Sequence, residues 1–210
     1  MRDYDGKTAA QRVADRRRRL IEAGYELFGE HGYAGTSVRA VLRRSGLQDR
    51  YFAESFADLD SLLAAVYERI IDEELIRCRA AIDAAGGSSA SARAMIDALT
   101  RALEGDRPRA RIKLREVLSA GPVTRRQRRK GLYNLAELVA ELLPPTPSSA
   151  GDPLLLALGV VATANELLIT WLDGERGLTR QGVVDAVTFM FDAVADRMAA
   201  TPTATWGSPG

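Results

Sequence analysis

The sequence predicts an all-α protein of about nine helices. Apolar residues recur along most of the chain at the spacing of a buried helix face, and the strict alternation of a half-buried strand is absent. The segments 84–91 (AAGGSSAS) and 144–153 (PPTPSSAGDP) interrupt the helical pattern. Proline inside a helix removes a hydrogen bond and clashes with the preceding turn, so the second segment must separate two helices.

The first helix is expected to begin near Ala9 and to end at Gly32, because glycine can adopt the left-handed conformation that closes a helix. Gly24 lies on the buried face of this helix, where it lowers helix propensity. We therefore expect a neighbouring helix to approach closely at Gly24. The buried face consists of Leu20, Ile21, Leu27 and Phe28.

Two short helices follow, with a single glycine between them. Thr36 is suited to cap the second helix, Gly46 makes the turn, and Gln48 stands at the N-cap of a third helix over Gln48–Ser55. Asp58 caps a long fourth helix whose apolar face continues for over four turns. The inward-facing residues of the second and third helices and their turn are Val38, Val41, Leu42, Leu47, Phe52 and Phe56.

The same spacing predicts five more helices after the first interruption. The last ten residues, 201–210, are rich in proline, glycine and threonine and are expected to be disordered. The expected helices are Ser91–Leu103, Arg107–Leu118, Pro122–Leu143, Leu154–Leu172 and Thr179–Met198.

Composition excludes several classes of protein. Hydrophobic residues make up 46% of the 210 residues, enough for a substantial core, but no uninterrupted apolar run approaches the roughly 20 residues of a membrane span. The N-terminus lacks the apolar core of a signal peptide, which indicates a cytoplasmic location. Cys78 and His31 are the only cysteine and histidine, so a His/Cys zinc site is excluded. We expect no cofactor, and no nucleophile–base pair or phosphate-binding glycine loop indicates an enzyme.

The net charge of +1 hides a strongly uneven distribution. Residues 1–57 carry a net charge of +3, 58–106 carry −5, 107–130 carry +9, and the remainder carries −6. The most basic segment, 107–130, is expected to form a solvated face balanced by acidic residues around Glu73. An acidic ligand, such as a phosphorylated or CoA-linked molecule, and a supplementary DNA contact are the alternatives.

A short helix, a glycine turn and a second short helix packed on a preceding helix describe a helix-turn-helix. Such a unit presents one short, rigid helix to the DNA major groove, where each base pair shows a distinct pattern of donors, acceptors and methyl groups. An ordinary small helical bundle with an arginine-rich surface is the alternative that this spacing leaves open.

Residues 18–67 (RRLIEAGYELFGEHGYAGTSVRAVLRRSGLQDRYFAESFADLDSLLAAVY) resemble the N-terminal DNA-binding domain of TetR/AcrR-type transcriptional regulators. The resemblance rests on the ELFGEHGYAGTSVRAV block, the SGL turn, the aromatic Phe56 and the leucine-rich start of the fourth helix. The C-terminal NELLITWLDGERGLTRQGVVDAV also resembles the second-to-last helix and loop of many members. Residues 1–57 are thus expected to bind DNA, and residues 58–200 to form a helical effector-binding and dimerisation domain.

The resemblance makes the third helix the recognition helix and assigns Phe52 to the core. Asp49 and Leu59 depart from the family pattern, because many relatives have lysine at both positions. A helical ligand-binding or adaptor protein with a helix-turn-helix that no longer binds DNA is therefore the alternative function. The four consecutive arginines of the first helix are further phosphate-binding candidates, and they predict salt-sensitive DNA binding. The expected DNA contacts are Arg16, Arg17, Arg18, Arg19, Thr36, Arg39, Gln48, Arg50 and Tyr51.

The resemblance also implies a homodimeric transcriptional regulator, which in most relatives is a repressor. Such a regulator is expected to dissociate from a palindromic DNA operator when a small-molecule effector binds. The last two helices are expected to form the dimer interface, and the protein is expected to be nucleoid-associated in the cytoplasm without a membrane partner. For the apolar candidates among the effector contacts, the alternative role is packing in the hydrophobic core. The candidate effector contacts are Met95, Leu99, Tyr133, Asn134, Glu137, Asn165, Glu166 and Trp171.

Overall fold

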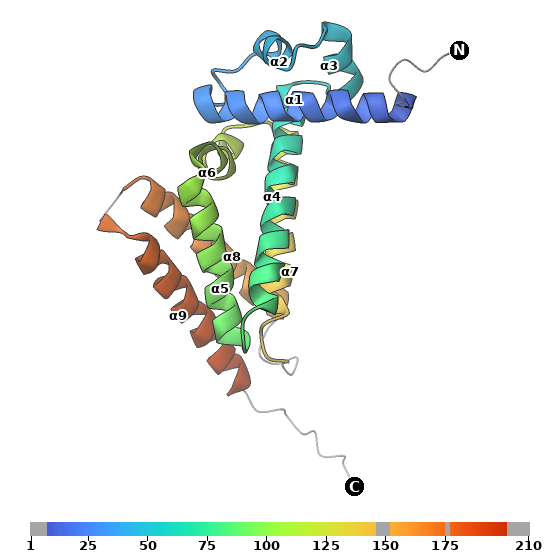
Figure 1. The fold of residues 1–210 in the computed structure, drawn as a ribbon. Coiled ribbons are helices and arrows are strands. Elements are labelled where there is room, and N and C mark those ends of the chain that lie inside the picture. The colour runs from blue at the N-terminus through green and yellow to red at the C-terminus, as the bar shows by residue number, and fades with distance from the viewer. Residues whose placement is uncertain (1–7, 146–151, 175–176, 201–210) are drawn as a thin grey trace. The chain divides into compact units, whose positions relative to one another are not determined.

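The computed structural model describes residues 8–145, 152–174 and 177–200, and over these ranges the chain is helical, without β-strands (Figure 1). The predicted all-α class is confirmed, and the same ranges contain nine α-helices and one short 3-10 helix, η1. The predicted disordered tail lies outside the described residues. In chain order the elements are α1 (Ala9–His31), α2 (Val38–Ser45), α3 (Asp49–Ser55), α4 (Leu59–Asp83), α5 (Ser88–Gly105), α6 (Arg107–Leu114), η1 (Glu116–Leu118), α7 (Pro122–Ala140), α8 (Pro153–Leu172) and α9 (Arg180–Ala199).

The chain divides into two compact units. The first contains the described residues up to Ile71 together with Asp106–Arg129. The second contains Asp72–Gly105 together with the described residues from Lys130 onward. Helices α4 and α7 therefore contribute residues to both units. The predicted division at residue 57 into a DNA-binding domain and an effector-binding and dimerisation domain stays a prediction.

Helix α1 begins and ends where its sequence predicts. Thr8 and Gln11 form a capping box, in which each side chain accepts a hydrogen bond from the other residue's backbone N–H. At the other end the N–H of Gly32 donates to the carbonyl of Phe28, with φ +76° and ψ 171°. The positive φ favours glycine, although the extended ψ differs from the expected left-handed helical conformation.

The helix-turn-helix turns at Gly46, as predicted, and this residue is in the left-handed region with φ 64° and ψ 34°. The predicted cap of α2 was wrong by one residue. Ser37 has the extended backbone of an N-cap, and its hydroxyl accepts the N–H of Ala40 at 3.2 Å. The hydroxyl of Thr36 instead donates to the carbonyl of Gly32 at 2.7 Å, so it is not available for capping.

The core of the first unit places α3 on a hydrophobic support. Phe52 and Phe56 are buried with their ring centroids 5.9 Å apart, while Leu47 is half-buried against the same cluster. Gly24 allows the close approach that its position predicted, because an added β-carbon would lie 3.1 Å from Leu62 and 3.3 Å from Val66. The apolar stripes of α1 and α4 thus meet at this glycine.

Several later helix boundaries differ from prediction. Helix α5 begins at Ser88, three residues earlier than expected, because the serine-rich part of the predicted linker is helical. Helix α6 ends at Leu114 and gives way to η1, since Arg115 leaves the helical region with φ −122° and ψ −56°. Helix α7 ends at Ala140, while α8 and α9 begin beside the side-chain caps Asp152 and Thr179.

In the second unit α9 packs against both α5 and α8 (Figure 1). Met95 and Leu99 of α5 are buried, as are Val183, Val187 and Phe191 of α9. Ion pairs reinforce this packing at the start of α9. Arg180 pairs with Asp97, and Arg93 pairs with Asp185 at 2.8 Å.

Helix α8 is more apolar than predicted from its interrupted run. It is long and apolar enough to span a membrane by length and composition alone, with a mean hydropathy of 1.7 over the apolar window. A single such helix is a weak indication of a membrane span, because a buried core helix can have the same length and composition. Only 22% of that window is buried, and Leu155 is 60% exposed, so α8 presents an uncovered apolar face.

Candidate DNA-binding surface and effector cleft

Of the residues at helix α3 that were predicted to read DNA, two are exposed and one is half-buried. Gln48 is at its N-cap without a side-chain capping bond, which leaves the exposed amide unengaged in helix capping. Arg50 is exposed, Tyr51 is half-buried, and Phe52 is in the core as predicted. With only two turns, α3 has the length of a helix that fits into the major groove before the groove curves away.

Arg50 and Tyr51 form one connected group. A guanidinium N–H of Arg50 donates to the Tyr51 hydroxyl at 2.7 Å, and the guanidinium carbon lies 4.6 Å from the ring centroid. Arg16 of α1 also lies over this ring, at 4.5 Å, and its Nη2 donates to both carboxylate oxygens of Glu54, at 2.9 and 3.1 Å. Helix α1 thus positions the exposed face of α3 through a cation–π contact and an ion pair.

The remaining arginines of the α1 run also have partners inside the first unit. Arg17 donates to the carbonyl of Ser55 at 2.9 Å and lies 4.3 Å over the Phe56 ring. Arg19 donates to the carbonyl of Ser45, at the end of α2. Three of the four arginines therefore brace the helix-turn-helix, a role that the charge pattern alone did not reveal. Only Arg18 pairs within α1, with Glu22 at 2.8 Å.

The other predicted DNA contacts differ in accessibility. Arg39 of α2 is exposed, whereas Thr36 is only 7% exposed and its hydroxyl is engaged by the Gly32 carbonyl. The two departures from the family pattern have different surroundings. Asp49 is exposed in the first turn of α3, where its negative charge interacts favourably with the helix dipole. Leu59 packs against the core of the first unit, which accounts for an apolar residue there.

The C-terminal half of α1 is held by α6 and η1. An added β-carbon on Gly29 would lie 2.5 Å from Cβ of Pro108, so the α1 backbone at Gly29 packs directly against the Pro108 ring of α6. Arg111 donates to the carbonyls of Gly29 and Glu30, at 3.2 and 3.0 Å, and thereby caps the end of α1. Glu116 accepts from Arg111 at 2.8 Å and from the Tyr33 N–H at 2.6 Å.

A polar cluster ties α1, α4 and the start of α6 together. The Tyr25 hydroxyl donates to Asp106, the N-cap of α6, and Arg69 of α4 lies 4.9 Å over the Tyr25 ring. Burial and the Asp106 carboxylate both raise the pKa of Tyr25 above its usual range, so the hydroxyl keeps its proton.

The segment 107–130 is not the uniformly solvated face that was predicted. Arg109 is only 6% exposed, donates to the Ile70 carbonyl at 3.4 Å, and lies 3.6 Å from Asp106. Lys113 is also buried. These side chains face inward because α6 packs against α1, whereas most of the basic residues of α7 are exposed.

Asp60 of α4 holds the first turn of α7. Its carboxylate accepts the backbone N–H groups of Val123 and Thr124, at 2.9 and 3.1 Å, and its carbonyl accepts the Thr124 hydroxyl at 2.9 Å. Burial raises the pKa of Asp60, but the hydrogen bonds from Thr124 and Val123 outweigh it and hold the pKa below the usual value. The α7 N-terminus is thereby fixed to α4.

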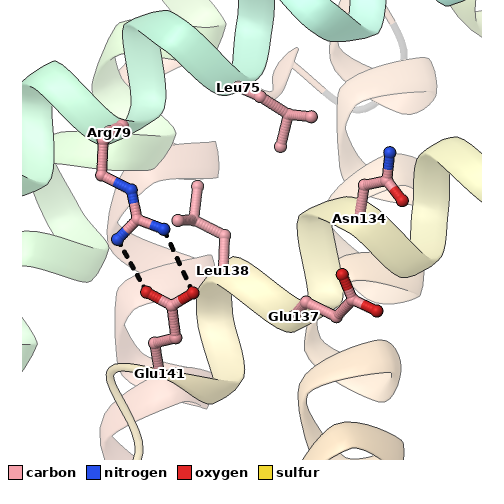
Figure 2. Close-up of a pocket in the computed structure, with 6 residues that line it drawn as sticks. All are labelled: Leu75, Arg79, Asn134, Glu137, Leu138 and Glu141. Carbon is pink, nitrogen blue, oxygen red and sulfur yellow. Dashed lines mark hydrogen bonds and ion pairs between the residues drawn. The ribbon is translucent and has the colours of Figure 1, made fainter.

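The second unit contains a cleft of about 370 Å³ between α4 and α7. Figure 2 shows the bidentate Arg79–Glu141 pair at one side of this cleft and the Asn134 and Glu137 side chains at the other. Of the candidate effector contacts, Asn134 and Glu137 line the cleft. The lining residues are Leu75, Arg79, Asn134, Glu137, Leu138 and Glu141.

The other candidate effector contacts do not line this cleft. Met95 and Leu99 are buried in the core, Glu166 is exposed, and Asn165 and Trp171 are half-buried on α8. Tyr133 is 37% exposed and neighbours the lining residue Asn134. Leu75, Arg79, Leu138 and Glu141 were missed, although Asn134, Glu137 and Leu138 of α7 and Glu141 just after its end follow one another at helical spacings of three and four residues.

Comparison with known proteins identifies the N-terminal segment. Residues 20–66 match the sequence profile of the family described as "Bacterial regulatory proteins, tetR family". These residues contain the helix-turn-helix with Arg50 and Tyr51, so the predicted resemblance is confirmed. No curated protein sequence gives a significant match to the chain.

Solved structures of transcriptional regulators have the same fold over most of the chain. The fatty acid degradation regulator FadR from Bacillus halodurans is 16% identical, with a TM-score of 0.69 over 84% of this chain and 94% of its own. FadR from Bacillus subtilis, in complex with stearoyl-CoA, is also 16% identical, with a TM-score of 0.69 over 86% of this chain and 98% of its own. The multidrug binding protein EbrR, complexed with imidazole, is 22% identical, with a TM-score of 0.66 over 83% of this chain and 94% of its own. At these identities the likeness establishes the fold.

Proposed function

We propose that this chain, a TetR/AcrR-type protein by its helix-turn-helix and its fold, is a homodimeric transcriptional repressor released from DNA by a small molecule. The observation that carries the proposal is the presentation of Arg50 and Tyr51 on a two-turn helix supported by buried Phe52. These residues lie inside the segment that matches the tetR family, and their partners fix their orientation.

In the proposed complex α3 enters the major groove, where Arg50 and Tyr51 contact bases. Gln48 and Arg39, both exposed, contact a base edge or the phosphate backbone. Thr36 contributes by stabilising the turn before α2, because its hydroxyl donates to the Gly32 carbonyl and is therefore not available to contact DNA. Arg18 is the member of the arginine run best placed for a phosphate, because its partners lie only within α1 and it is 61% exposed.

Dimerisation through α8 and α9 would place two copies of α3 on a palindromic operator. The support for this interface is the exposed apolar surface of the two helices. Phe189 of α9 is 73% exposed and Leu155 of α8 is 60% exposed, although α8 and α9 also pack against each other within one chain. Exposed large apolar groups on neighbouring helices are typical of protein–protein interfaces.

The effector is proposed to bind in the cleft between α4 and α7. Both helices continue from the second unit into the first, where Asp60 fixes the start of α7. A ligand that shifts these helices would therefore act on the unit that carries α3. Release of DNA requires the ligand to prefer the conformation that fits the operator poorly, because equal affinity for both conformations shifts nothing.

Titration of the dimer against its own upstream DNA in gel-shift assays tests this proposal. Specific binding that is lost on replacing Arg50 and Tyr51 is the expected result. Absence of any shift up to micromolar dimer would instead favour the alternative, a ligand-binding or adaptor protein whose helix-turn-helix no longer binds DNA. A transcription assay with the upstream promoter then distinguishes repression from activation.

A further inference from the structure

We infer that the α4–α7 cleft binds a small organic cation, with an ammonium or amidinium group on a short apolar body. The inference rests on the proposed effector role of this cleft and adds the chemical class of the ligand. All six lining residues belong to the second unit. The volume of about 370 Å³ is at the lower end of the range for small-molecule sites, which suits one compact molecule.

The charges that line the cleft do not balance. Arg79 and Glu141 neutralise each other, since Nη1 and Nη2 of the arginine donate to the two carboxylate oxygens at 2.7 and 3.1 Å. The hydrogen bond from Arg79 holds the pKa of Glu141 below its usual range, so the pair stays ionised at neutral pH.

Glu137 is the charge that remains. Its side chain is exposed at the cleft, and no described residue forms a hydrogen bond or ion pair with its carboxylate. The lining therefore holds two carboxylates and one guanidinium, a net charge of −1. An anion entering the cleft would meet an arginine whose guanidinium is already engaged and an uncompensated negative charge.

The other lining groups specify an organic cation rather than a bare metal ion. Asn134 lies one helical turn before Glu137 and provides an amide oxygen that can accept an N–H, as a carboxylate does. Half-buried Leu75 and buried Leu138 line the space between these polar groups and the Arg79–Glu141 pair (Figure 2). In the described part of the chain no group of three His, Cys, Asp or Glu residues is arranged to hold a metal ion.

Three matched probes test the charge of the ligand: 4-phenylbutylamine, 4-phenylbutan-1-ol and 4-phenylbutanoate. They share the apolar body and differ in a positive, neutral or negative head group. Isothermal titration calorimetry on the full chain should show the amine binding at least about tenfold more tightly than the alcohol, and the acid most weakly. Equal affinity for amine and alcohol, tighter binding of the acid, or no binding of any probe would overturn the inference.

Two variants locate the selectivity. Glu137→Gln keeps the shape of the side chain and should reduce the preference for the amine over the alcohol to about twofold or less. Asn134→Leu removes the second acceptor and should weaken the amine several-fold. Glu104→Gln is the matched control, because Glu104 is an exposed glutamate of the same unit outside the cleft, and it should retain the preference. Retention of the preference in Glu137→Gln would place the cation elsewhere.

Operator binding separates this inference from the proposed function. If 4-phenylbutylamine binds in a Glu137-dependent manner but leaves operator affinity unchanged, the cation site stands and release by its ligand fails. If another class of molecule releases the DNA while the amine does not bind, the regulatory function stands and the cation site fails.

Discussion

Arg50 carries the most direct prediction at the scale of single residues. Its N–H already donates to the Tyr51 hydroxyl, so this hydroxyl's own hydrogen and the other guanidinium N–H groups are free to donate. A pair of donors matches guanine, which presents two acceptors, N7 and O6, in the major groove. Replacing Arg50 by alanine should cost about 1–3 kcal/mol of binding free energy and relax a guanine preference at one base position.

Binding-site selection on randomised DNA, compared between wild type and Arg50→Ala, measures this effect. Tyr51→Phe, which keeps the ring and removes only the hydroxyl, measures separately what this hydroxyl contributes to the preference. A uniform loss over all sequences on removal of Arg50 would instead assign this residue to a phosphate.

Arg16 and Arg18 form a matched pair for the arginine run. Each phosphate contact contributes about −0.9 to the slope of log affinity against log salt concentration. Arg16→Ala should weaken DNA binding without changing this slope, because Arg16 acts on Tyr51 and Glu54 inside the protein. Arg18→Ala should make the slope shallower by about one while leaving stability within about 0.5 kcal/mol.

Fluorescence anisotropy with operator DNA over a range of salt concentrations gives both slopes. Wild-type binding should be strongly salt-dependent, and a flat dependence would contradict a phosphate-driven interaction. A shallower slope for Arg16→Ala would show that Arg16 leaves Glu54 to contact DNA.

At the scale of elements, the attachment of α7 to α4 through Asp60 has a predictable energy. Asp60→Ala removes the acceptor for two backbone N–H groups at the α7 N-terminus and should lower the free energy of unfolding by about 1–3 kcal/mol. The folded-state pKa of Asp60 is lowered, so its carboxylate stabilises the fold at neutral pH, and this contribution declines as the pH falls below about 4.

Urea unfolding of wild type and Asp60→Ala at neutral pH and below pH 4 tests both parts. The difference in stability should shrink at the lower pH. Asp60→Asn, which keeps an acceptor but loses the charge, should be intermediate at neutral pH. A difference that does not change with pH would show that packing, and not the carboxylate, holds α7.

The helices themselves were predictable because their signals are local. Thr8, Gly32, Gly46 and Asp58 mark helix ends through bonds that span only a few residues. The last three were predicted, and Thr8 directly precedes the predicted start at Ala9. The N-cap of α2 was missed because Thr36 and Ser37 have equivalent hydroxyl chemistry. Only the folded turn shows that the Gly32 carbonyl engages one of them.

The candidate site was less predictable because its contacts are distant in sequence. The partners of Arg16 and Arg17 lie 38 residues away, and Arg79 lies 62 residues from Glu141. A run of arginines has the same sequence whether it contacts phosphates or carbonyls. The exposure of Arg50 and the burial of Phe52 were predicted correctly, because the buried aromatics set the orientation of a short helix, whereas the half-burial of Tyr51 was not predicted.

At the scale of the whole molecule, Phe189 tests the proposed dimer. A buried aspartate without a partner opposes association, so Phe189→Asp should weaken the dimer by about 2 kcal/mol or more and reduce operator affinity with it. Ile76→Asp is the control, because Ile76 is 71% exposed on α4 of the same unit. Sedimentation equilibrium measures the association, and a dimer unaffected by Phe189→Asp would place the interface elsewhere.

The contact between Gly29 and Pro108 leaves no room for even one methyl group. Replacing Gly29 by alanine would push α6 away from α1. The Arg111 side chain of α6 would then be displaced from the α1 carbonyls that it caps. A genetic screen for variants that no longer show the proposed repression, or no longer respond to the proposed effector, should therefore recover substitutions at both positions. Neither residue needs to meet operator or effector to be found in such a screen.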